Sequence, residues 1–385
     1  MRVVKVRSPF IVEIPSQGIT HTGSKIILTI WNNGGTEPTS GQSGYYSLSK
    51  NNPSTIQKST IYNVSNYVKE FINNIEPQPL AQSFTQAENE TATEWCKFRV
   101  RKYWYNGTTY TEIGSGVLYF GVNGFESYTN GNQNPVDTKL MILSNPDINH
   151  YYNGMVDYVT DPITFASYYR EETINVMYDK LSTDSFSVQW QYLGGSTFFT
   201  QNISVGVASS GNLKIPLSYL YSELGQTNVR LIITMTWNSG IDVIQYLIES
   251  YQTDECKYTP VRCTFINRYG GWQDLVFFKA QTNTIAVKGT DYKLTQDTIN
   301  YNTSIGQFKT FNLNGKQTIK LNTGFVDENY SELITDLLLS ETVLLDDKPV
   351  TVKTQGSDLK TSLKDRLINY EMEFEYAYNL INDVV

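Results

Sequence analysis

Four carboxylates beside a tyrosine-rich stretch come closest, by type and spacing, to residues that could do chemistry. Asp157 and Asp161 precede the segment "FASYY", and Glu171 and Glu172 follow it, so the tyrosines could line a sugar-binding cleft. Glycosidases use two carboxyl groups at a set separation, one of them with a raised pKa. However, a chain with 38 acidic residues offers such pairs by chance, so the pattern alone does not define an enzyme.

Histidine and cysteine add little further chemistry. Both histidines, His21 and His150, stand in polar, loop-like stretches, whereas imidazole metal sites and catalytic triads need a histidine that neighbouring groups orient. The cysteines Cys96, Cys256 and Cys263 are too few for a disulfide framework. We expect free structural thiols, although Cys256 and Cys263 could pair if the chain turned back between them. The sequence also lacks CxxC, HExxH and phosphate-loop motifs, so we predict no catalytic residue, metal or cofactor.

The stretch "FINRYGGWQDLVFF", residues 265–278, gathers Arg, Tyr, Trp and Asp around two glycines. Apolar runs on both sides favour a hairpin connection in which Gly270 or Gly271 takes a positive φ. Trp272 is expected to pack at the hairpin base with its N–H on a backbone acceptor or on a partner, and Arg268 is a candidate subunit contact. The apolar faces of the two strands are expected to be Val261, Cys263, Phe265 and, opposite them, Leu275 and Phe277.

Two predicted strands carry charge on alternate residues, which places like charges on one face of a sheet. We call them the basic comb, Lys97, Arg99 and Arg101, and the acidic comb, Glu371, Glu373 and Glu375. Carboxylates spread along a strand do not converge on a cation as Ca²⁺ ligands do. Both combs are therefore candidate subunit interfaces, and solvated strand faces are the alternative. The basic comb could also form a small anion patch.

Length and charge bound the class of protein. A chain of 385 residues favours two or three domains. Its net charge of −8 argues against nucleic-acid binding, which needs a basic field. No run approaches about eighteen apolar residues, and the first residues lack the apolar region of a secretion signal. We expect a protein made in a cytoplasm that does not span a membrane.

Period-2 alternation recurs along the chain and predicts a mainly β fold. Its abundant Tyr and Thr favour half-buried strands, and its Asn, Ser and Gly favour turns. Strands are expected at 26–31, 96–104, 117–120, 186–192, 229–237, 285–289, 316–321, 343–353 and 368–376. Apolar residues at i, i+3 and i+4 predict short amphipathic helices within 64–75 and at 329–340, with one or two helical turns at 215–224.

A loose internal repeat organises these elements. Strand 26–31, a helical turn and strand 96–104 are followed by strand 186–192, a second helical turn and strand 229–237. This order predicts tandem β-sandwich modules, followed by a mixed, β-rich C-terminal domain. We predict domains at 1–135, at 136–258 (a linker excursion and the second sandwich) and at 259–385.

Several stretches suggest a family. The opening "RSPFIVEI", the run "YYSLSKNNPSTIQKSTIYNVSNYVKEFI", the 265–278 stretch and the closing "INYEMEFEYAYNLIND" together resemble virion structural proteins of crAss-like bacteriophages. These are short-tailed phages of gut Bacteroidota. The resemblance implies a β-rich tail or neck component that stacks as a ring between the portal and the distal tail, and it implies no catalytic residues.

Composition points to the same class of protein, one that works by making interfaces. Such interfaces use aromatic anchors within polar rims, and a closed ring needs head-to-tail contacts between two different patches of each subunit. We therefore expect a non-enzymatic ring subunit in the virion tail or neck. Its partners would be copies of itself and other tail, neck or portal proteins, around a lumen for the genome. A carbohydrate-binding or adhesin module with exposed Tyr and Trp platforms, and a glycan-cleaving virion enzyme, are the open alternatives.

Overall fold

A computed structural model describes most of the chain. The described residues are 1–16, 21–32, 35–52, 59–74, 93–131, 135, 137–144, 173–192, 198–202, 209–216, 228–237, 240, 242–251, 257–295, 299, 302–326, 330–354, 356 and 368–381. The chain divides into two compact units. Unit 1 comprises Met1–Asp254 and Ile266–Gln273, and unit 2 comprises Glu255–Phe265 and Asp274–Val385. The predicted boundary at 258/259 lies near the first crossing between units, and the predicted boundary at 135/136 stays a prediction.

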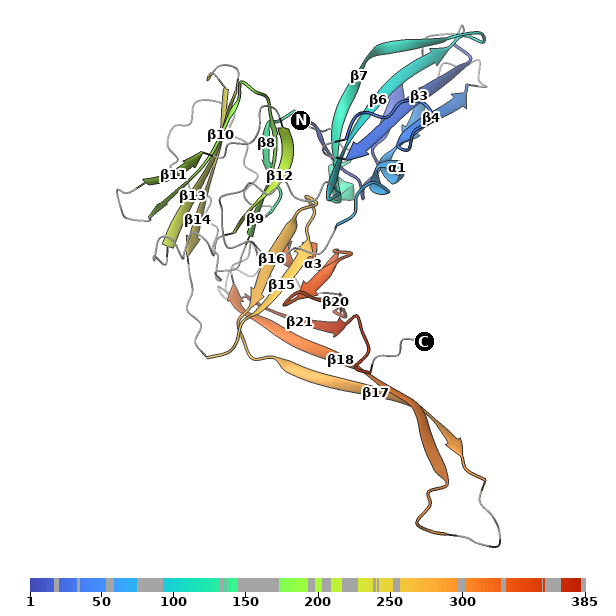
Figure 1. The fold of residues 1–385 in the computed structure, drawn as a ribbon, viewed down its shortest axis with the longest axis vertical. Coiled ribbons are helices and arrows are strands. Elements are labelled where there is room, and N and C mark those ends of the chain that lie inside the picture. The colour runs from blue at the N-terminus through green and yellow to red at the C-terminus, as the bar shows by residue number, and fades with distance from the viewer. Residues whose placement is uncertain are drawn as a thin grey trace. The chain divides into compact units, whose positions relative to one another are not determined.

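The N-terminal part of unit 1 pairs a large sheet with a small one (Figure 1). The large sheet has the order β1-β7-β6-β3-β4, and β2 pairs with β5 in the small one. The strands are β1 (Val3–Lys5), β2 (Ile11–Ile14), β3 (Gly23–Asn32), β4 (Tyr45–Asn51), β5 (Thr60–Asn63), β6 (Trp95–Tyr105) and β7 (Tyr110–Val122). Val12 and Tyr62 of the small sheet share one buried cluster with Ile26, Leu28 and Phe98 of the large sheet. Two sheets with a common apolar interior form a β-sandwich.

The remaining strands of unit 1 form two further sheets. One has the order β12-β9-β8 and the other β11-β10-β13-β14. The strands are β8 (Leu140–Ile142), β9 (Thr173–Lys180), β10 (Ser185–Tyr192), β11 (Phe198–Asn202), β12 (Ser209–Pro216), β13 (Asn228–Trp237) and β14 (Asp242–Tyr251). Tyr178 of β9 and Phe186 of β10 are buried and stack with ring centroids 5.3 Å apart, so an aromatic pair joins the two sheets.

Unit 2 is built on one seven-stranded sheet with the order β16-β15-β19-β20-β21-β18-β17. Its elements are β15 (Val261–Ile266), β16 (Trp272–Phe277), β17 (Thr282–Lys293), β18 (Phe308–Val326), α3 (Tyr330–Leu338), β19 (Val343–Leu345), β20 (Lys348–Val352) and β21 (Ile368–Tyr376). Ile334 and Leu337 of α3 pack into the same core as Phe374 of β21. That core also contains the five side chains predicted to form the apolar faces of the 265–278 hairpin, which confirms the prediction.

The observed elements confirm the mainly β fold class and refine several element bounds. The first predicted helix is only α1 (Ser65–Lys69), because i→i−3 bonds from Phe71 to Val68 and from Ile72 to Lys69 tighten and end it. The strand expected at 343–353 is the hairpin β19–β20, since Asp346 and Asp347 have positive φ values of 44° and 63° and turn the chain back. Pro216 ends a strand, and the helical turns expected after it lie outside the described residues.

Neither described helix, α1 or α3, is long and apolar enough to cross a membrane.

Candidate functional site

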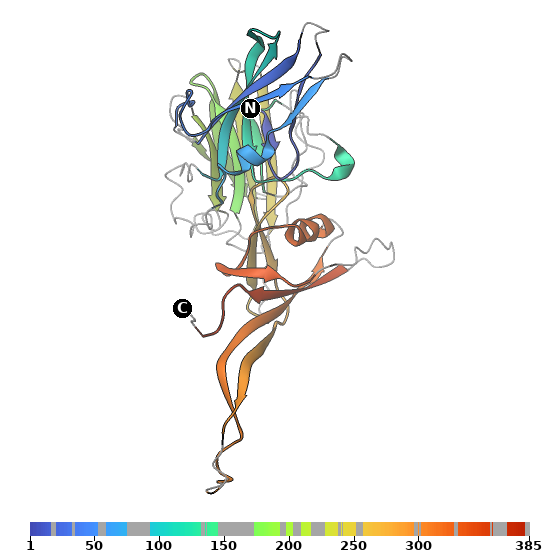
Figure 2. The ribbon, with the colours of Figure 1, turned by 90° about the vertical axis from the view of Figure 1, so that its right-hand side faces the viewer.

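The β17–β18 hairpin extends beyond the rest of the unit 2 sheet (Figures 1 and 2). β18 pairs with β21 only as far as Thr318, which lies opposite Glu375. Its pairing with β17 continues to Phe308, opposite Lys293. From Phe308 to Gln317, β17 is therefore the only neighbouring strand within the described chain, over about 30 Å at the usual rise of a strand.

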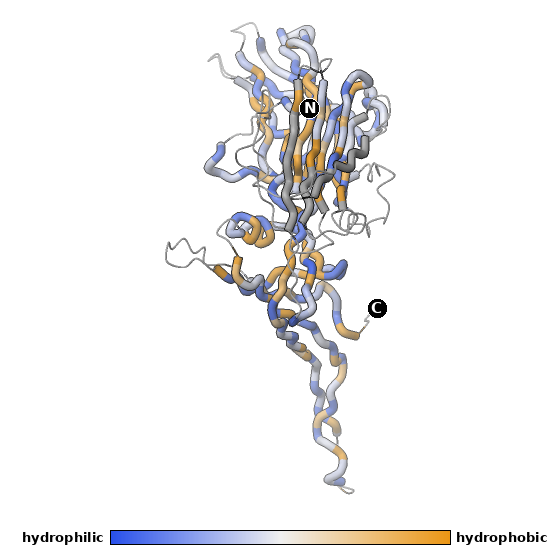
Figure 3. The backbone as a smooth tube through the Cα atoms, turned by 90° about the vertical axis from the view of Figure 1, so that its left-hand side faces the viewer, coloured by the Kyte–Doolittle hydropathy of each residue, from blue (hydrophilic) through white to orange (hydrophobic). Residues whose placement is uncertain are grey.

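One side of this hairpin carries exposed apolar side chains, with Asp291 and Lys293 between them in the distal part. Ile285 and Val287 lie on the face from which Ile319 enters the core of unit 2, because directly paired residues and alternate residues share a face. Beyond the core Ile285 is 58% and Val287 59% exposed. Leu313 and Phe308 continue this side at 53% and 65% exposure. We call Ile285, Val287, Phe308 and Leu313 the apolar side; Figure 3 shows apolar and polar residues alternating along the hairpin.

The C-terminal segment adds to the apolar side. The Leu380 amide donates to the Gly315 carbonyl at 2.8 Å. The Asn314 side chain holds Ile381 at both its carbonyl and its amide, at 3.0 and 3.1 Å. A Cβ at Gly315 would lie 3.1 Å from Cδ1 of Leu380 and 3.6 Å from Cγ2 of Ile285. Leu380, 45% exposed, therefore lies beside Ile285 on the same side.

A β-bulge interrupts the hairpin midway. The register shifts between Lys288 and Thr290, and Asn312 opposite them has a φ of 51°. A Cβ at Gly289 would lie 2.8 Å from Cδ1 of Leu313, so a side chain at residue 289 would displace the end of the Leu313 side chain. Bulges increase local twist. This one turns the distal part of the hairpin relative to its base.

So much exposed surface is unusual for a two-stranded hairpin at the edge of a sheet. Every residue of β17 is exposed, and β17 is the edge strand of its sheet. A two-stranded hairpin alone is marginally stable in water, and natural proteins normally shield long, uncovered edges. Exposed apolar patches commonly mark binding sites. The apolar side is therefore the strongest candidate binding surface in the described chain.

The acidic comb lies on the opposite, polar side of the same sheet and is largely paired within unit 2. Lys320 bonds Glu371 at 2.6 Å, and Lys316 and Lys353 bond Glu375 at 3.1 and 3.0 Å. The Lys320 amine lowers the pKa of Glu371, and Lys353 followed by Lys316 lowers the pKa of Glu375. The comb was predicted as one strand face, and its alternation is confirmed: the residues between its members are buried.

The basic comb lies on β6 in unit 1 and is also partly neutralised. Arg99 and Arg101 both pair with the Glu37 carboxylate, Arg101 at 2.7 Å. The Lys97 amine lies 5.7 Å from the centroid of the Trp95 ring, and burial lowers the pKa of Lys97. The two combs belong to different units, and their role in subunit contacts stays a prediction.

The turn of the 265–278 stretch belongs to unit 1 and is organised by a buried asparagine. Asn267 is 0% exposed; its Nδ2 donates to the Leu143 carbonyl at 2.6 Å. Its Oδ1 accepts the amides of Tyr269 and Gly271 at 2.9 and 3.3 Å. Gly270 has a φ of 82°, which confirms the predicted glycine turn. These contacts make the stretch a structural turn.

Trp272 follows that turn and is also buried in unit 1, at 4% exposure. Its Nε1–H donates to the Glu94 carboxylate at 3.1 Å, and Lys214 also bonds Glu94 at 3.3 Å. Asn175 Nδ2 donates to the Trp272 carbonyl at 2.5 Å. The expected buried ring and satisfied N–H are present, but the acceptor is a distant carboxylate of unit 1. The Arg268 side chain on the same turn is half-buried, and its role in a subunit contact stays a prediction.

The residues weighed for catalysis are only partly described. His21 is half-buried with its ring centroid 5.2 Å from that of Trp104. His150 and the four carboxylates beside the tyrosine-rich stretch lie outside the described residues. Within the described ranges, no group of three His, Cys, Asp or Glu side chains could hold a metal ion.

Two of the three cysteines are described, and both are buried free thiols. Burial raises the pKa of Cys96 to about 12 and that of Cys263 well above its ordinary value. Thiols kept protonated by burial are poor nucleophiles. The prediction of free structural thiols is confirmed for Cys96 and Cys263, and Cys256 lies outside the described residues.

Sequence reasoning identified strands within the β17–β18 hairpin but missed its exposed side. The available signal was the length of the alternating runs at 282–293 and 308–320, which flank a stretch rich in Thr, Asn and Gln. Two such runs predict a long hairpin, but not which part of it a neighbouring strand covers.

Comparison with models of known protein families finds no match for this chain, and a search of curated proteins finds no significantly similar sequence. The described surfaces therefore carry the functional argument.

Proposed function

We propose that this chain is a non-catalytic structural subunit of a bacteriophage virion, which assembles with copies of itself into a ring in the tail or neck. The β17–β18 hairpin is the arm that joins neighbouring subunits. The observation that carries the proposal is the exposed apolar side of this hairpin. The sequence resemblance to virion structural proteins supports the phage context.

The energetics favour a covered hairpin. Burying a Val, Leu, Ile or Phe side chain completely stabilises a complex by about 1.5–3 kcal/mol. Ile285 and Val287 are each more than half exposed, so covering the exposed parts contributes roughly 1 kcal/mol each. A neighbouring subunit that lay against β17 would also satisfy the outward N–H and C=O groups of this edge strand.

A protruding arm suits a ring. In a closed ring each subunit presents one patch and receives a different patch from its neighbour. An arm on one side and a receiving surface on the other meet this requirement without two-fold symmetry. Each subunit carries a net charge of −8, so like-charge repulsion should weaken assembly at low ionic strength.

The test removes the apolar side chains nearest the sheet. The double variant Ile285→Ser, Val287→Ser should weaken self-association about 30-fold, from roughly 2 kcal/mol of lost burial. Sedimentation velocity over a range of protein and salt concentrations measures the association. Ile61→Ser is the matched control, because Ile61 in unit 1 is 53% exposed but lies outside the arm. All variants should keep the wild-type free energy of unfolding, since none of these side chains is buried.

Electron microscopy of the purified wild-type protein should show closed rings at concentrations where sedimentation shows assembly. A wild-type protein that stays monomeric at all concentrations and salt levels would contradict the proposal. Specific glycan binding by such a monomer would support the adhesin alternative. Release of sugar from host surface material would support the enzyme.

A further inference from the structure

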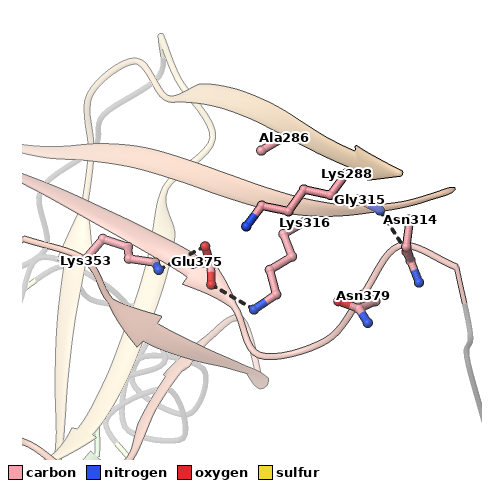
Figure 4. A pocket seen from close by; sticks show the side chains of 8 residues that line it. All are labelled: Ala286, Lys288, Asn314, Gly315, Lys316, Lys353, Glu375 and Asn379. Carbon is pink, nitrogen blue, oxygen red and sulfur yellow. Dashed lines mark hydrogen bonds and ion pairs between the residues drawn. The ribbon is translucent and has the colours of Figure 1, made fainter. Parts of the chain in front are cut away.

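A hollow of about 270 Å³ opens on the polar side of the hairpin base in unit 2 (Figure 4). Lys288 of β17 and Lys316 of β18 line it, together with Lys353, which follows β20, and Glu375 of β21. Asn379 completes the polar lining. Lys288, Lys316 and Glu375 lie on paired strands of one sheet, and the Lys353 amide bonds the Glu373 carbonyl of β21 at 2.8 Å. The backbone positions that carry these four side chains are therefore held together.

The charges in this hollow do not balance. Lys316 and Lys353 share the single Glu375 carboxylate at 3.1 and 3.0 Å. Lys288 forms no ion pair with any described carboxylate, although Figure 4 shows its amine pointing toward the same region. Three amines and one carboxylate leave an excess of two positive charges, in a protein whose net charge is −8.

The strand register brings two of these like charges together. Ala286 lies opposite Lys316, and Lys288 lies opposite Asn314, so the two lysines are diagonal neighbours on one face. Diagonal neighbours lie within reach of long side chains, and like charges on facing strands repel. Glu375 relieves this repulsion only in part, because it is already bonded to Lys316 and Lys353.

We propose that this hollow is a binding site for one oxyanion group, a carboxylate or a phosphate, held by Lys288, Lys316 and Lys353. Ammonium groups make short, charge-assisted hydrogen bonds to such oxygens, and lysine acts as a flexible point charge that adapts to the ligand. A hollow lined by an excess of positive charge also concentrates anions locally. The proposal does not depend on the assembly role of the apolar side, which lies on the other face of the hairpin.

Isothermal titration calorimetry with sodium phosphate tests the site, against sodium chloride at equal ionic strength. Saturable phosphate binding is expected for the wild type. Lys288→Gln should weaken it about tenfold, because one charge-assisted contact is lost, and Glu375 keeps both of its ion pairs. Lys293→Gln is the matched control: it removes the same charge from the same strand outside the hollow, and it should bind phosphate like the wild type.

Sedimentation of the same proteins distinguishes the two sources of the oxyanion. If the ligand is a free phosphate, the anion binds without changing the association state. If the ligand is an acidic side chain of a second copy, phosphate should dissociate the assembly, and Lys288→Gln should weaken it in phosphate-free buffer. Absence of phosphate binding beyond the chloride control, together with unchanged association of Lys288→Gln, would overturn the proposal. The proposal would also be overturned if Lys288→Gln and Lys293→Gln weakened phosphate binding equally. The double variant Ile285→Ser, Val287→Ser should bind phosphate like the wild type. Phosphate binding therefore tests the hollow even if the assembly proposal fails.

Discussion

Replacing Trp272 by alanine should destabilise unit 1 although Trp272 follows a turn between two strands of the unit 2 sheet. The ring is 4% exposed, and its N–H bonds a carboxylate, Glu94, in unit 1. Truncating a buried Trp to Ala typically costs about 3–5 kcal/mol, through lost burial and the cavity left behind. This is a large part of the 5–15 kcal/mol by which domains are usually stable.

A second substitution separates the ring from its hydrogen bond. Trp272→Phe keeps most of the apolar volume but removes the N–H donor to Glu94. Because Lys214 still bonds this carboxylate, the expected cost is about 1.5–3 kcal/mol, the usual worth of a hydrogen bond to a charged group. Urea denaturation should therefore rank the wild type above Trp272→Phe, and Trp272→Phe above Trp272→Ala. Trp104→Ala, which removes a half-buried Trp from the same unit, should cost less than Trp272→Ala.

Hydrogen exchange measured by mass spectrometry locates the loss. The amides of β6 and β9 in unit 1 should lose protection in Trp272→Ala, and those of β21 in unit 2 should keep theirs. If Trp272→Ala unfolded within about 1 kcal/mol of the wild type, the buried role of this ring would be refuted, because core truncations of this size cost more. Loss of protection confined to β21 would instead favour the original expectation of a role in the C-terminal domain.

Two more substitutions in unit 1 have defined outcomes. Gly270→Val should lower the melting temperature markedly, because its φ is 82° and its Cβ would lie 2.8 Å from the backbone nitrogens of Asn123 and Gly124; Gly131→Ala, with a φ of 73° but open space, isolates the smaller cost of backbone strain. Burial raises the pKa of Cys96 from 9.0 to about 12, so this thiol ionises in the unfolded chain before it ionises in the folded protein. Its contribution to the free energy of unfolding is therefore complete below pH 9.0 and is lost as the pH rises toward 12. In urea titrations across that range the wild type should lose about 1.4 kcal/mol per pH unit more than Cys96→Ala, and equal slopes in the two proteins would argue against the assignment.

Local patterns predicted strand orientation well. On β21 the acidic comb alternates with Tyr370, Met372 and Phe374, and these three side chains are buried. Alternation settles such a face because strand side chains have a period of two. The glycine turn was predictable for a similar reason, since a positive φ strongly favours glycine.

Long-range partners were not predictable from these patterns. Trp272 and Glu94 are 178 positions apart, and nothing in either local sequence indicates the pairing. The expected place of Trp272 in the C-terminal domain followed from chain order, whereas the turn that carries it packs in unit 1. The single expected strand at 343–353 failed because two consecutive aspartates adopt positive φ, a conformation that Asp tolerates but does not require.

The exposure of the β17–β18 hairpin could not be predicted from the sequence for a different reason. Alternating residues such as Ile285 and Val287 have the same pattern whether a neighbouring layer covers them or not. Their exposure depends on where the adjacent strand stops, and β21 stops pairing with β18 at Thr318. Strand length relative to its neighbours is a property of the whole sheet, so the local sequence could indicate the hairpin but not its uncovered side.

The two proposed roles of the hairpin predict opposite responses to salt. On the polar side, attraction between lysines and an oxyanion is screened as ionic strength rises, since the Debye length shortens from about 10 Å at 0.1 M to about 3 Å at 1 M salt. On the apolar side, burial of Ile285 and Val287 involves no charge and is strengthened by excluded salts such as sulfate. Salt would also screen the repulsion between copies of a chain whose net charge is −8. If both proposals hold, assembly through the apolar side should strengthen with salt, while phosphate binding in the hollow should weaken.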